Sequence, residues 1–321
     1  MQQNYKIIGF LKVMKVLIAD KLKEKGIELF KKNGFDVTTD YSITPEKLHD
    51  EIKQYDAIVV RSRTKLTSEI LERAEKLKVI GRAGVGLDNI DLKKAEELNI
   101  KVLNTPEAPS VSVAELVMGL ILSLVRHISD ADQTTHCGEW CKGDYMGYVL
   151  KGKKIGIIGF GNIGQAVAKR CEAFEMQIGI YDKDPAVIEL AKKKGYTVYP
   201  KVDQLIQDVK IISLHIPATG ETENTIDERR LKMMKKDTII INTARGNLVD
   251  EQALVNAVKS KQIGGAALDV YREEPLKNME LCNCEDNLVL TPHIGSQTVE
   301  TQTEASRMVA EKIINFLKPQ K

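Results

Sequence analysis

The chain has 321 residues, 43% of them hydrophobic and 29% charged, and a formal net charge of +2. This profile is typical of a globular protein, and the length suffices for two domains of ordinary size. Because the near-neutral charge creates no strong field, neither nucleic acid nor a membrane is expected as a partner. The five cysteines show no disulfide-rich spacing, which favours reduced thiols and a cytoplasmic protein. No metal site is expected, because His136, Cys137 and Cys141 lack the spacing of zinc ligands.

Strands and helices alternate along the N-terminal third. Residues 1–13 lack a basic, apolar targeting pattern and are expected to be an extension ahead of the first strand. The alternation predicts an α/β fold built on doubly wound, Rossmann-like parallel sheets. The expected strands cover 15–20, 35–39, 57–61, 78–82 and 100–103, with helices such as 22–33 and 67–76 between them.

The segment 110–128 predicts a helix that is apolar nearly all round. Glu115 and Arg126 interrupt the apolar run, and we therefore expect no membrane span. Such a helix is buried, and we expect it to lie between the subunits of a homodimer. The next segment, 129–150, is expected to be a loop that forms an interface arm. It carries the large side chains Trp140, Tyr145, Met146 and Tyr148.

The stretch from Lys154 to Asp182 carries the most informative local motif. The apolar strand KIGII leads into Gly159-x-Gly161-x-x-Gly164, a helix follows, and a second strand ends at Asp182. The first glycine permits a tight turn, the second lets backbone N–H groups approach a pyrophosphate, and the third lets the helix pack close to the strand. The helix N-terminus favours the anion, and the Asp182 carboxylate can accept a hydrogen bond from a ribose 2′-OH. The motif therefore predicts an NAD site, and the carboxylate favours NAD over NADP.

A second series of strands includes this motif and ends in an amphipathic helix. The expected strands cover 154–158, 177–182, 210–214, 238–242, 266–270 and 288–291, and the helix covers about 298–317. Open α/β sheets bind their ligands at the carboxyl ends of the strands. The two series predict two similar domains with a cleft between them.

Three polar residues at the expected strand ends suffice, with NAD, for oxidising a 2-hydroxy acid. Arg245 can bind a carboxylate through its planar fork, His293 can exchange a proton near neutral pH, and Glu274 can hold the imidazole. Each has a structural alternative, namely a surface charge, a satisfied core histidine and a solvated turn. His215 is interpreted as a cofactor-loop residue, and Asp250 as the N-cap of the helix that follows it.

Blocks of sequence along nearly the whole chain resemble the D-isomer-specific 2-hydroxyacid dehydrogenase family. They are VRSRTKLT (60–67), GRAGVGLDNID (81–91), NTPEAPSVSVAEL (104–116), GIIGFGNIGQAVA (156–168), HIPAT (215–219), NTARGNLVDEQAL (242–254), AALDVYREEP (266–275) and TPHIGSQT (291–298). Within the family, the first two blocks look most like short-type D-3-phosphoglycerate dehydrogenase.

The resemblance implies roles for particular residues. Arg245, Glu274 and His293 are the implied catalytic set, with His293 as acid/base. Beside the three glycines of the motif, the expected cofactor contacts are Asn162, Ile163, Asp182, His215, Ile216, Pro217, Thr243, Ala244, Asp269 and Gly295. The expected substrate contacts are Arg61, Ser62, Arg82, Gly84, Val85 and Gly86. The implied domains are a discontinuous substrate domain, 14–108 plus 295–321, and an NAD-binding domain, 109–294.

The expected reaction is NAD-dependent oxidation of D-3-phosphoglycerate to 3-phosphohydroxypyruvate in serine biosynthesis, by hydride transfer from C2. The phosphate carries about −1.5 to −2 charges in addition to the carboxylate. Because Arg245 cannot serve both ends, Arg61 and Arg82 are expected at the far end, and Arg63 shares the side of Arg61 if that segment is extended. Two alternatives stay open: a reductase of glyoxylate, hydroxypyruvate or another small 2-oxo acid, and an NAD-sensing binding protein similar to a corepressor of this fold.

Overall fold

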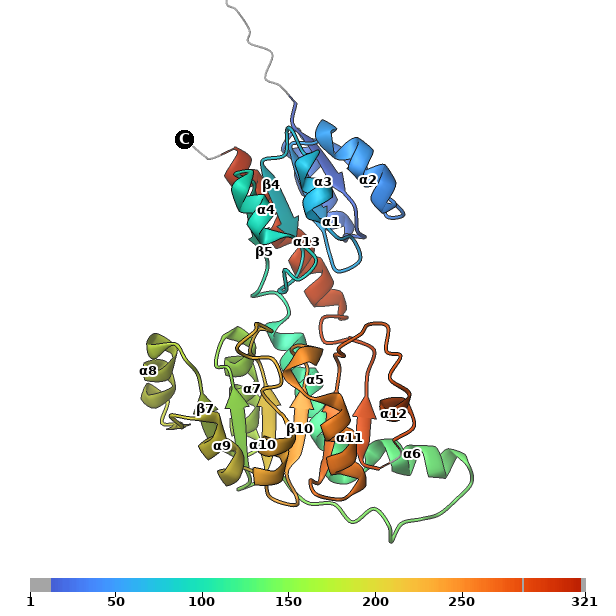
Figure 1. The fold of residues 1–321 in the computed structure, drawn as a ribbon, viewed down its shortest axis with the longest axis vertical. Coiled ribbons are helices and arrows are strands. Elements are labelled where there is room, and N and C mark those ends of the chain that lie inside the picture. The colour runs from blue at the N-terminus through green and yellow to red at the C-terminus, as the bar shows by residue number, and fades with distance from the viewer. Residues whose placement is uncertain (1–12, 285, 319–321) are drawn as a thin grey trace, which may run out of the picture. The chain divides into compact units, whose positions relative to one another are not determined.

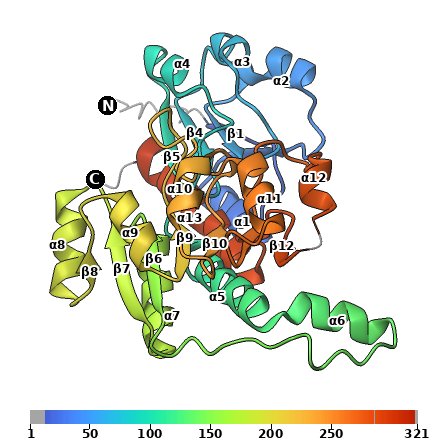
Figure 2. The same ribbon diagram turned by 60° about the horizontal axis from the view of Figure 1, so that its bottom comes forward.

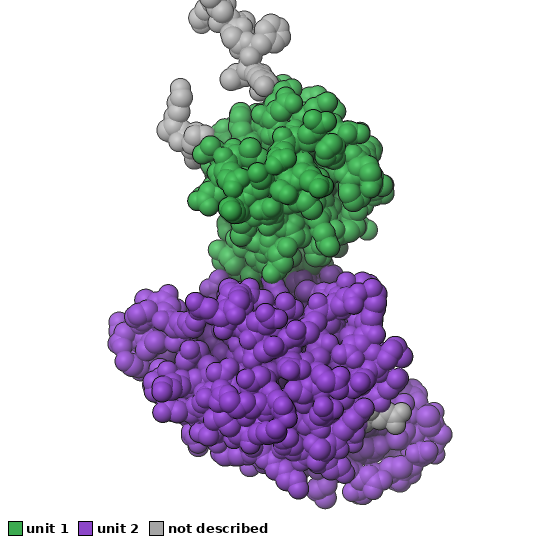
Figure 3. Space-filling view, viewed as in Figure 1, with its two compact units in different colours: residues 1–108, 299–321 green, residues 109–298 purple. Residues whose placement is uncertain are grey.

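The structure, a computed structural model, describes residues 13–284 and 286–318. The chain divides into two compact units, Met1–Ala108 with Val299–Lys321 (unit 1) and Pro109–Thr298 (unit 2), which Figure 3 colours separately. Each unit is built on a parallel sheet, and the expected doubly wound α/β fold is confirmed. The expected boundary after residue 294 lies just before the division after Thr298. Residues 1–12 of the expected extension lie outside the described residues.

Unit 1 has a five-stranded sheet in the order β2-β1-β3-β4-β5, of which Figure 1 labels β4 and β5. Its strands are β1 (Lys15–Ile18), β2 (Asp36–Thr39), β3 (Ala57–Val60), β4 (Val79–Arg82) and β5 (Lys101–Asn104). Its helices are α1 (Glu24–Lys32), α2 (Pro45–Glu51), the 3-10 turn η1 (Ile52–Gln54), α3 (Ser68–Glu72), α4 (Leu92–Glu97) and α13 (Val299–Leu317). One face of the sheet packs on α1 and α13 and the other on α2, α3 and α4. Because both faces are covered, the central strand β3 reads AIVV and is buried throughout.

Unit 2 has a seven-stranded sheet in the order β12-β11-β10-β9-β6-β7-β8. Its strands are β6 (Lys154–Ile158), β7 (Gln177–Tyr181), β8 (Thr197–Val198), β9 (Ile211–Leu214), β10 (Ile239–Asn242), β11 (Gly265–Leu268) and β12 (Leu288–Leu290). Its helices are α5 (Ser110–Arg126), α6 (Ile128–His136), α7 (Asn162–Ala173), α8 (Pro185–Lys193), α9 (Val202–Asp208), α10 (Glu228–Met233), the 3-10 turn η2 (Gly246–Leu248), α11 (Glu251–Lys259) and α12 (Met279–Cys282).

The layers and strand order of unit 2 place the glycine motif within the sheet. One face of the sheet packs on α5 and α7, and the other packs on α9, α10 and α11. The strand order reverses at β6, which lies between β7 and β9. In a doubly wound sheet such a reversal opens a crevice at the carboxyl ends of the two strands. The glycine motif follows β6 directly, at this point of the sheet.

Two expectations about the elements of unit 2 were wrong. The helix expected over 110–128 ends at Arg126, because His127 takes a left-handed conformation (φ 53°, ψ 41°). The segment expected to be a loop over 129–150 begins with the helix α6, which lies outside the layers of unit 2 in Figure 2. All residues of α6 are described and none is buried, which is why its sequence shows no apolar periodicity. The two-residue strand β8 was not expected.

The helix α5 packs inside unit 2. Nine of its residues are buried, and all of these except Ser112 belong to one hydrophobic cluster with α7 and the sheet. Its apolar composition is therefore accounted for by packing within the unit. The exposed side of α5 is a narrow stripe through Val111, Glu115, Gly119 and Arg126, and a subunit contact through this stripe stays a prediction.

A test of helix length and apolar composition finds no single helix in the described ranges that is able to cross a membrane. Taken together, α5 and α6 pass this test, although they are bent by 66° relative to each other. Within the same ranges, no group of three or more His, Cys, Asp or Glu side chains is arranged to hold a metal ion.

Candidate active site

The glycine motif forms a tight turn between β6 and α7. Gly159 has φ +95°, and a Cβ built on it would lie 2.5 Å from the carbonyl oxygen of His215. A Cβ on Gly164 would lie 2.1 Å from the carbonyl oxygen of Gly159, and α7 could not then pack so close to the turn. At Gly161, in contrast, no described atom lies within 4 Å of a Cβ. This open space at the N-terminus of α7 fits a pyrophosphate held by backbone N–H groups.

Asp182 lies just beyond the end of β7 and braces the glycine turn. Its Oδ2 accepts a hydrogen bond from the backbone N–H of Phe160 at 2.7 Å, and its Oδ1 accepts one from the N–H of Asp184 at 2.9 Å. A carboxylate has about four acceptor sites, and Asp182 is only partly buried. It therefore retains capacity for a ribose hydroxyl. The neighbouring Lys183 is ion-paired with Glu221 at 2.7 Å.

His215 follows β9 on the other side of the strand-order reversal. Its Nε2 lies 2.8 Å from Oγ of Ser213, which is fully buried. Burial lowers the pKa of His215 to about 3, and the ring is neutral at physiological pH. A neutral histidine next to Gly159 is consistent with a cofactor-loop residue and leaves proton transfer to another group.

Other expected cofactor residues also follow the carboxyl ends of adjacent strands. Asn162 and Ile163 begin α7, after β6, whereas the remaining ones follow β9, β10, β11 and β12. These remaining residues are Ile216, Pro217, Thr243, Ala244, Asp269 and Gly295. The hydroxyl of Thr243 is buried and makes no hydrogen bond within the described part of the chain. A buried polar atom normally has a partner, and a bound dinucleotide would provide one.

Arg245 lies on a loop that its neighbours hold in place. The buried side chain of Asn242 donates to the carbonyl of Arg245 at 2.8 Å and accepts from the N–H of Ala244 at 3.1 Å. A Cβ on Gly246 would lie 1.9 Å from the carbonyl carbon of Tyr271. The loop after β10 can therefore touch the backbone that leads to Glu274 only because residue 246 is glycine.

Glu274 and His293 form a hydrogen-bonded pair. Nδ1 of His293 lies 2.7 Å from Oε2 of Glu274, while Oε1 accepts from the N–H of Tyr271 at 3.1 Å. Burial alone would raise the pKa of Glu274, but the hydrogen bond and charge of His293, with the charge of Arg245, lower it overall. Glu274 is thus an anion that orients the ring and stabilises imidazolium. The other ring nitrogen, Nε2, can exchange a proton with a ligand.

Asp269 holds the loop that carries His293. Its Oδ1 accepts from Oγ1 of Thr291 at 2.6 Å and from the N–H of Ile294 at 2.8 Å, and its Oδ2 accepts from the N–H of Gly295 at 2.8 Å. Asp269 is almost fully buried, with 1% exposure. It was expected to contact the cofactor, and its described contacts are structural.

The sequence analysis did not identify the residues that hold the backbone of the site loops in place. Tyr271 is buried, and its hydroxyl donates to the carbonyls of Leu268 and Thr291 at 3.1 and 2.8 Å. It thereby ties the glutamate segment to the histidine segment. The polar Asn242 at the end of the apolar run TIIIN was a readable signal, because a buried amide normally serves a backbone turn. No comparable signal marked Tyr271.

In unit 1, the expected substrate residues lie at the carboxyl ends of adjacent strands. Arg61 follows β3 and Arg82 ends β4, and the register pairs Val60 with Arg82. Burial lowers the pKa of Arg61, although the charge of Asp20 acts in the opposite direction. Its backbone N–H donates to Asp20 at 2.5 Å.

Two loops complete this edge of unit 1. Ser62 is exposed beside Arg61, and the loop with Gly84, Val85 and Gly86 is partly buried. Asn104 donates from its side chain to the carbonyl of Val85 at 2.7 Å. The arrangement places two guanidinium-bearing residues at the ends of neighbouring strands, beside a glycine-rich backbone.

The condition under which Arg63 was expected on the side of Arg61 is not met. The strand β3 ends at Val60, and the alternation of sides that would place Arg63 with Arg61 does not apply beyond it. The guanidinium of Arg63 instead donates to Asp20 at 3.0 Å and to the carbonyls of Ala19 and Ile43 at 2.6 and 3.2 Å. Its donors hold loops of unit 1 together.

Unit 2 combines a glycine turn of the kind that binds dinucleotides with a hydrogen-bonded histidine–carboxylate pair. Residues 118–295 match the family model described as "D-isomer specific 2-hydroxyacid dehydrogenase, NAD binding domain". The chain belongs to the D-isomer specific 2-hydroxyacid dehydrogenase family. The match confirms NAD as the expected cofactor.

The similar proteins include enzymes named for a phosphorylated substrate and enzymes named for unphosphorylated substrates. The chain is 44% identical over 307 residues to D-3-phosphoglycerate dehydrogenase of Methanocaldococcus jannaschii, covering 95% of this chain and 58% of that relative. It is 42% identical to hydroxypyruvate reductase of Thermotoga maritima, covering 94% of this chain and 98% of that one. The solved structure of a glyoxylate reductase from Paecilomyes thermophila aligns with a TM-score of 0.87 and 29% identity, covering 96% and 97% of the two chains.

Proposed function

We propose that this protein is an NAD-dependent dehydrogenase that oxidises D-3-phosphoglycerate at C2 to 3-phosphohydroxypyruvate, within serine biosynthesis. The observation that carries the dehydrogenase assignment is the pair formed by His293 and Glu274, with a 2.7 Å hydrogen bond between them. The charge of Arg245 acts on the same carboxylate. The three residues thus form one electrostatic group and are proposed as the catalytic set.

Each residue has a defined part in the proposed reaction. Nε2 of His293 accepts the proton of the C2 hydroxyl, and Glu274 stabilises the imidazolium that results. Arg245 binds the substrate carboxylate and polarises the adjacent C2 oxygen as it becomes a carbonyl. Bound NAD supplies the acceptor for the hydride that leaves C2. In the reverse direction His293 returns the proton to the carbonyl oxygen.

The phosphorylated substrate is supported by charge. A phosphate of about −1.5 to −2 charges needs cations apart from the arginine that holds the carboxylate. Arg61 and Arg82 lie at the ends of paired strands, and we propose that they bind the phosphate, with Ser62 and the backbone of Gly84, Val85 and Gly86. The relative from Methanocaldococcus jannaschii, which is named for this reaction, has 44% identity. A second candidate, reduction of hydroxypyruvate, is favoured by the relative from Thermotoga maritima, of which this chain covers 98%.

The substrate assignment is tested by the variants Arg61→Gln and Arg82→Gln. Each removes one charge that pairs with the phosphate, and kcat/KM for D-3-phosphoglycerate should fall about tenfold to hundredfold. The value for D-glycerate should change little. Arg73→Gln serves as control, since Arg73 is an exposed arginine of unit 1. If kcat/KM falls equally for both substrates, the arginines do not recognise the phosphate. That result would favour reduction of hydroxypyruvate as the function.

We also propose a cytoplasmic homodimer. The segment that follows α6 carries three exposed apolar residues. These are Trp140, Met146 and Val149, which are 85%, 86% and 70% exposed. Large apolar side chains clustered on one surface segment are typical of interfaces between subunits. The occupant we assign to this segment is a second copy of the chain, contacting it together with the exposed stripe of α5. The five free thiols support the cytoplasmic location.

A further inference from the structure

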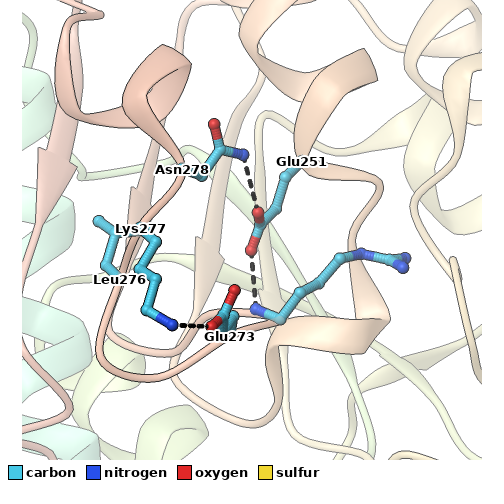
Figure 4. Close-up of a pocket in the computed structure, with 6 residues that line it drawn as sticks. Glu251, Glu273, Leu276, Lys277 and Asn278 are labelled. Atoms are coloured by element: carbon cyan, nitrogen blue, oxygen red, sulfur yellow. Dashed lines mark hydrogen bonds and ion pairs between the residues drawn. The ribbon is translucent and has the colours of Figure 1, made fainter.

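A buried carboxylate lies outside the group that the proposed reaction uses. Glu251 is the first residue of α11 and is 8% exposed. It lines a pocket of about 280 Å³ with Arg272, Glu273, Leu276, Lys277 and Asn278 (Figure 4). A buried carboxylate is costly unless its oxygens are hydrogen-bonded. The partners of Glu251 therefore indicate why it is there.

Both oxygens of Glu251 bind the segment that carries Glu274. Oε1 accepts from the backbone N–H of Arg272 at 2.8 Å, and Oε2 accepts from the side-chain amide of Asn278 at 3.0 Å. The two contacts lie on either side of Glu274 in sequence. Figure 4 shows Glu251 and Asn278 facing each other across the pocket. One carboxylate thus holds residues 271–278, called here the 271–278 segment, against α11 through contacts on both sides of Glu274.

The helix itself does not need this carboxylate as a cap. Asp250 is the N-cap of α11, and its Oδ1 accepts from the N–H of Ala253 at 3.0 Å. The first turn of a helix favours a negative charge, which offsets part of the cost of burying Glu251. Its two hydrogen bonds to the 271–278 segment remain to be explained, and they are contacts to a part of the chain more than 20 residues away.

We propose that Glu251 is a positioning residue for the acid–base pair, holding the 271–278 segment so that Glu274 meets Nδ1 of His293. This inference rests on the proposed roles of Glu274 and His293. The segment has further supports on the same side: Arg272 donates from Nε to the carbonyl of Val249 at 3.2 Å and pairs with Glu223 at 3.6 Å. These contacts use the side chain of Arg272, whereas Glu251 holds its backbone.

The variant Glu251→Gln isolates one of the two contacts. The Gln carbonyl oxygen can still accept from the N–H of Arg272, but its NH₂ group then faces the NH₂ group of Asn278. Asn278 cannot resolve this by flipping, because its Oδ1 caps α12 by accepting from the N–H groups of Glu280 and Leu281 at 3.1 and 3.4 Å. Asn278→Asp is the complementary variant: it keeps the cap and loses the donor to Glu251.

The matched control is Glu273→Gln. Glu273 is adjacent to Glu274 and pairs with the side chain of Lys277, and its neutralisation removes the same charge close to the same segment. It removes no hydrogen bond to the backbone. A through-space effect of charge would therefore appear in this control as well. Urea unfolding and NADH fluorescence titration show that each variant is folded and binds the cofactor.

The experiment measures kcat, KM and the pH profile of kcat/KM, in parallel for NAD with D-3-phosphoglycerate and NADH with hydroxypyruvate. We expect Glu251→Gln and Asn278→Asp to lower kcat about tenfold, within the roughly hundredfold that a 1 Å misplacement can cost. The KM for the cofactor should be the same as in the unsubstituted protein. The acidic limb of the oxidation profile should move to lower pH, in the direction of Glu274→Gln, because a loosened Glu274 stabilises imidazolium less. Glu273→Gln should match the unsubstituted protein.

Three results overturn the inference, and they are distinguishable. If Glu274→Gln lowers kcat and moves the limb while both Glu251→Gln and Asn278→Asp keep the original values, Glu251 does not position the pair. A shift in Glu273→Gln equal to that in Glu251→Gln has the same consequence, because charge alone then explains it. If Glu274→Gln itself leaves kcat and the profile unchanged with both substrates, the proposed acid–base pair is wrong and the inference falls with it.

Discussion

At the scale of single residues, the pairing of His293 with Glu274 is supported by the carboxylate of Asp269 and the backbone of Tyr271. Asp269 holds the backbone after His293 through the N–H groups of Ile294 and Gly295. The N–H of Tyr271 meets Oε1 of Glu274 at 3.1 Å. The pair is thus held in place from both of its loops. Pre-organisation of this kind lowers the reorganisation needed during reaction.

The first prediction concerns the proposed acid/base. His293→Ala should lower kcat by at least about a thousandfold, since general acid–base catalysis contributes up to four orders of magnitude. NAD affinity should be retained, because the described contacts of the glycine turn do not involve His293. Steady-state rates and a fluorescence titration with NADH measure the two quantities. Loss of NADH binding would mean that His293 is a cofactor residue.

The second prediction concerns His215, the neutral histidine whose backbone lies against Gly159 of the glycine turn. Burial lowers the pKa of His215 to about 3, compared with about 6.5 in an unfolded chain. Between these values the unfolded chain binds a proton that the folded chain does not. Stability from this group is therefore complete above pH 6.5 and is lost as the pH falls towards 3.

The comparison is between the unsubstituted protein and His215→Gln in urea unfolding at pH 7.5 and pH 5. The unsubstituted protein should lose more unfolding free energy over this interval than the variant, which has no imidazole to protonate. Equal losses would show that the ring is not held neutral.

At the scale of elements, the central strands were predictable because buried parallel strands are continuous apolar runs, such as KIGII in β6 and AIVV in β3. The N-cap Asp250 was also predictable, because its side chain accepts from the N–H of Ala253, which is only three residues away in the sequence. The helix α6 was missed because the sequence ISDADQTTH has no apolar stripe. Contacts such as that of Glu251 with the N–H of Arg272 join elements far apart in the chain, and no periodicity identifies which carboxylate reaches which N–H.

The third prediction tests the contact between two loops. Gly246→Ala places a Cβ where the backbone carbonyl carbon of Tyr271 lies at 1.9 Å, and one of the loops must move. We expect a loss of about 2–3 kcal/mol in unfolding free energy, as for overpacked cores, together with reduced kcat. Gly220→Ala is the control, since no described atom lies within 4 Å of a Cβ there. Equal stability of the two variants would contradict the close approach.

At the scale of the whole molecule, the family and the cofactor follow from motifs that the sequence carries in order. Glu274 and His293 follow the neighbouring strands β11 and β12 and form a hydrogen bond, because parallel strands end at one edge of a sheet. The condition set for Arg63 could not be checked in the sequence, because the end of β3 at Val60 cannot be located to the residue from apolar runs alone. The substrate class depends on charge pairing in the bound state, which sequence patterns indicate only through Arg61 and Arg82.

The fourth prediction addresses assembly. Trp140→Asp with Met146→Asp places two charges on the segment that follows α6, where the native side chains are 85% and 86% exposed. Burying an unpaired carboxylate in an interface is costly, and the double variant should sediment as a monomer. Its unfolding free energy at low protein concentration should be unchanged, because neither side chain packs within the chain. A double variant that still sediments as a dimer would place the interface elsewhere.

The measurement that tests the central claim most directly is the initial rate of NAD reduction with D-3-phosphoglycerate and with D-glycerate, at alkaline pH with a trap for the 2-oxo product. The two acids differ only in the phosphate. If Arg61 and Arg82 recognise that group, kcat/KM for D-3-phosphoglycerate should be at least about tenfold higher, as expected for hydrogen bonds to a charged group. An equal or higher kcat/KM for D-glycerate would contradict the proposed substrate.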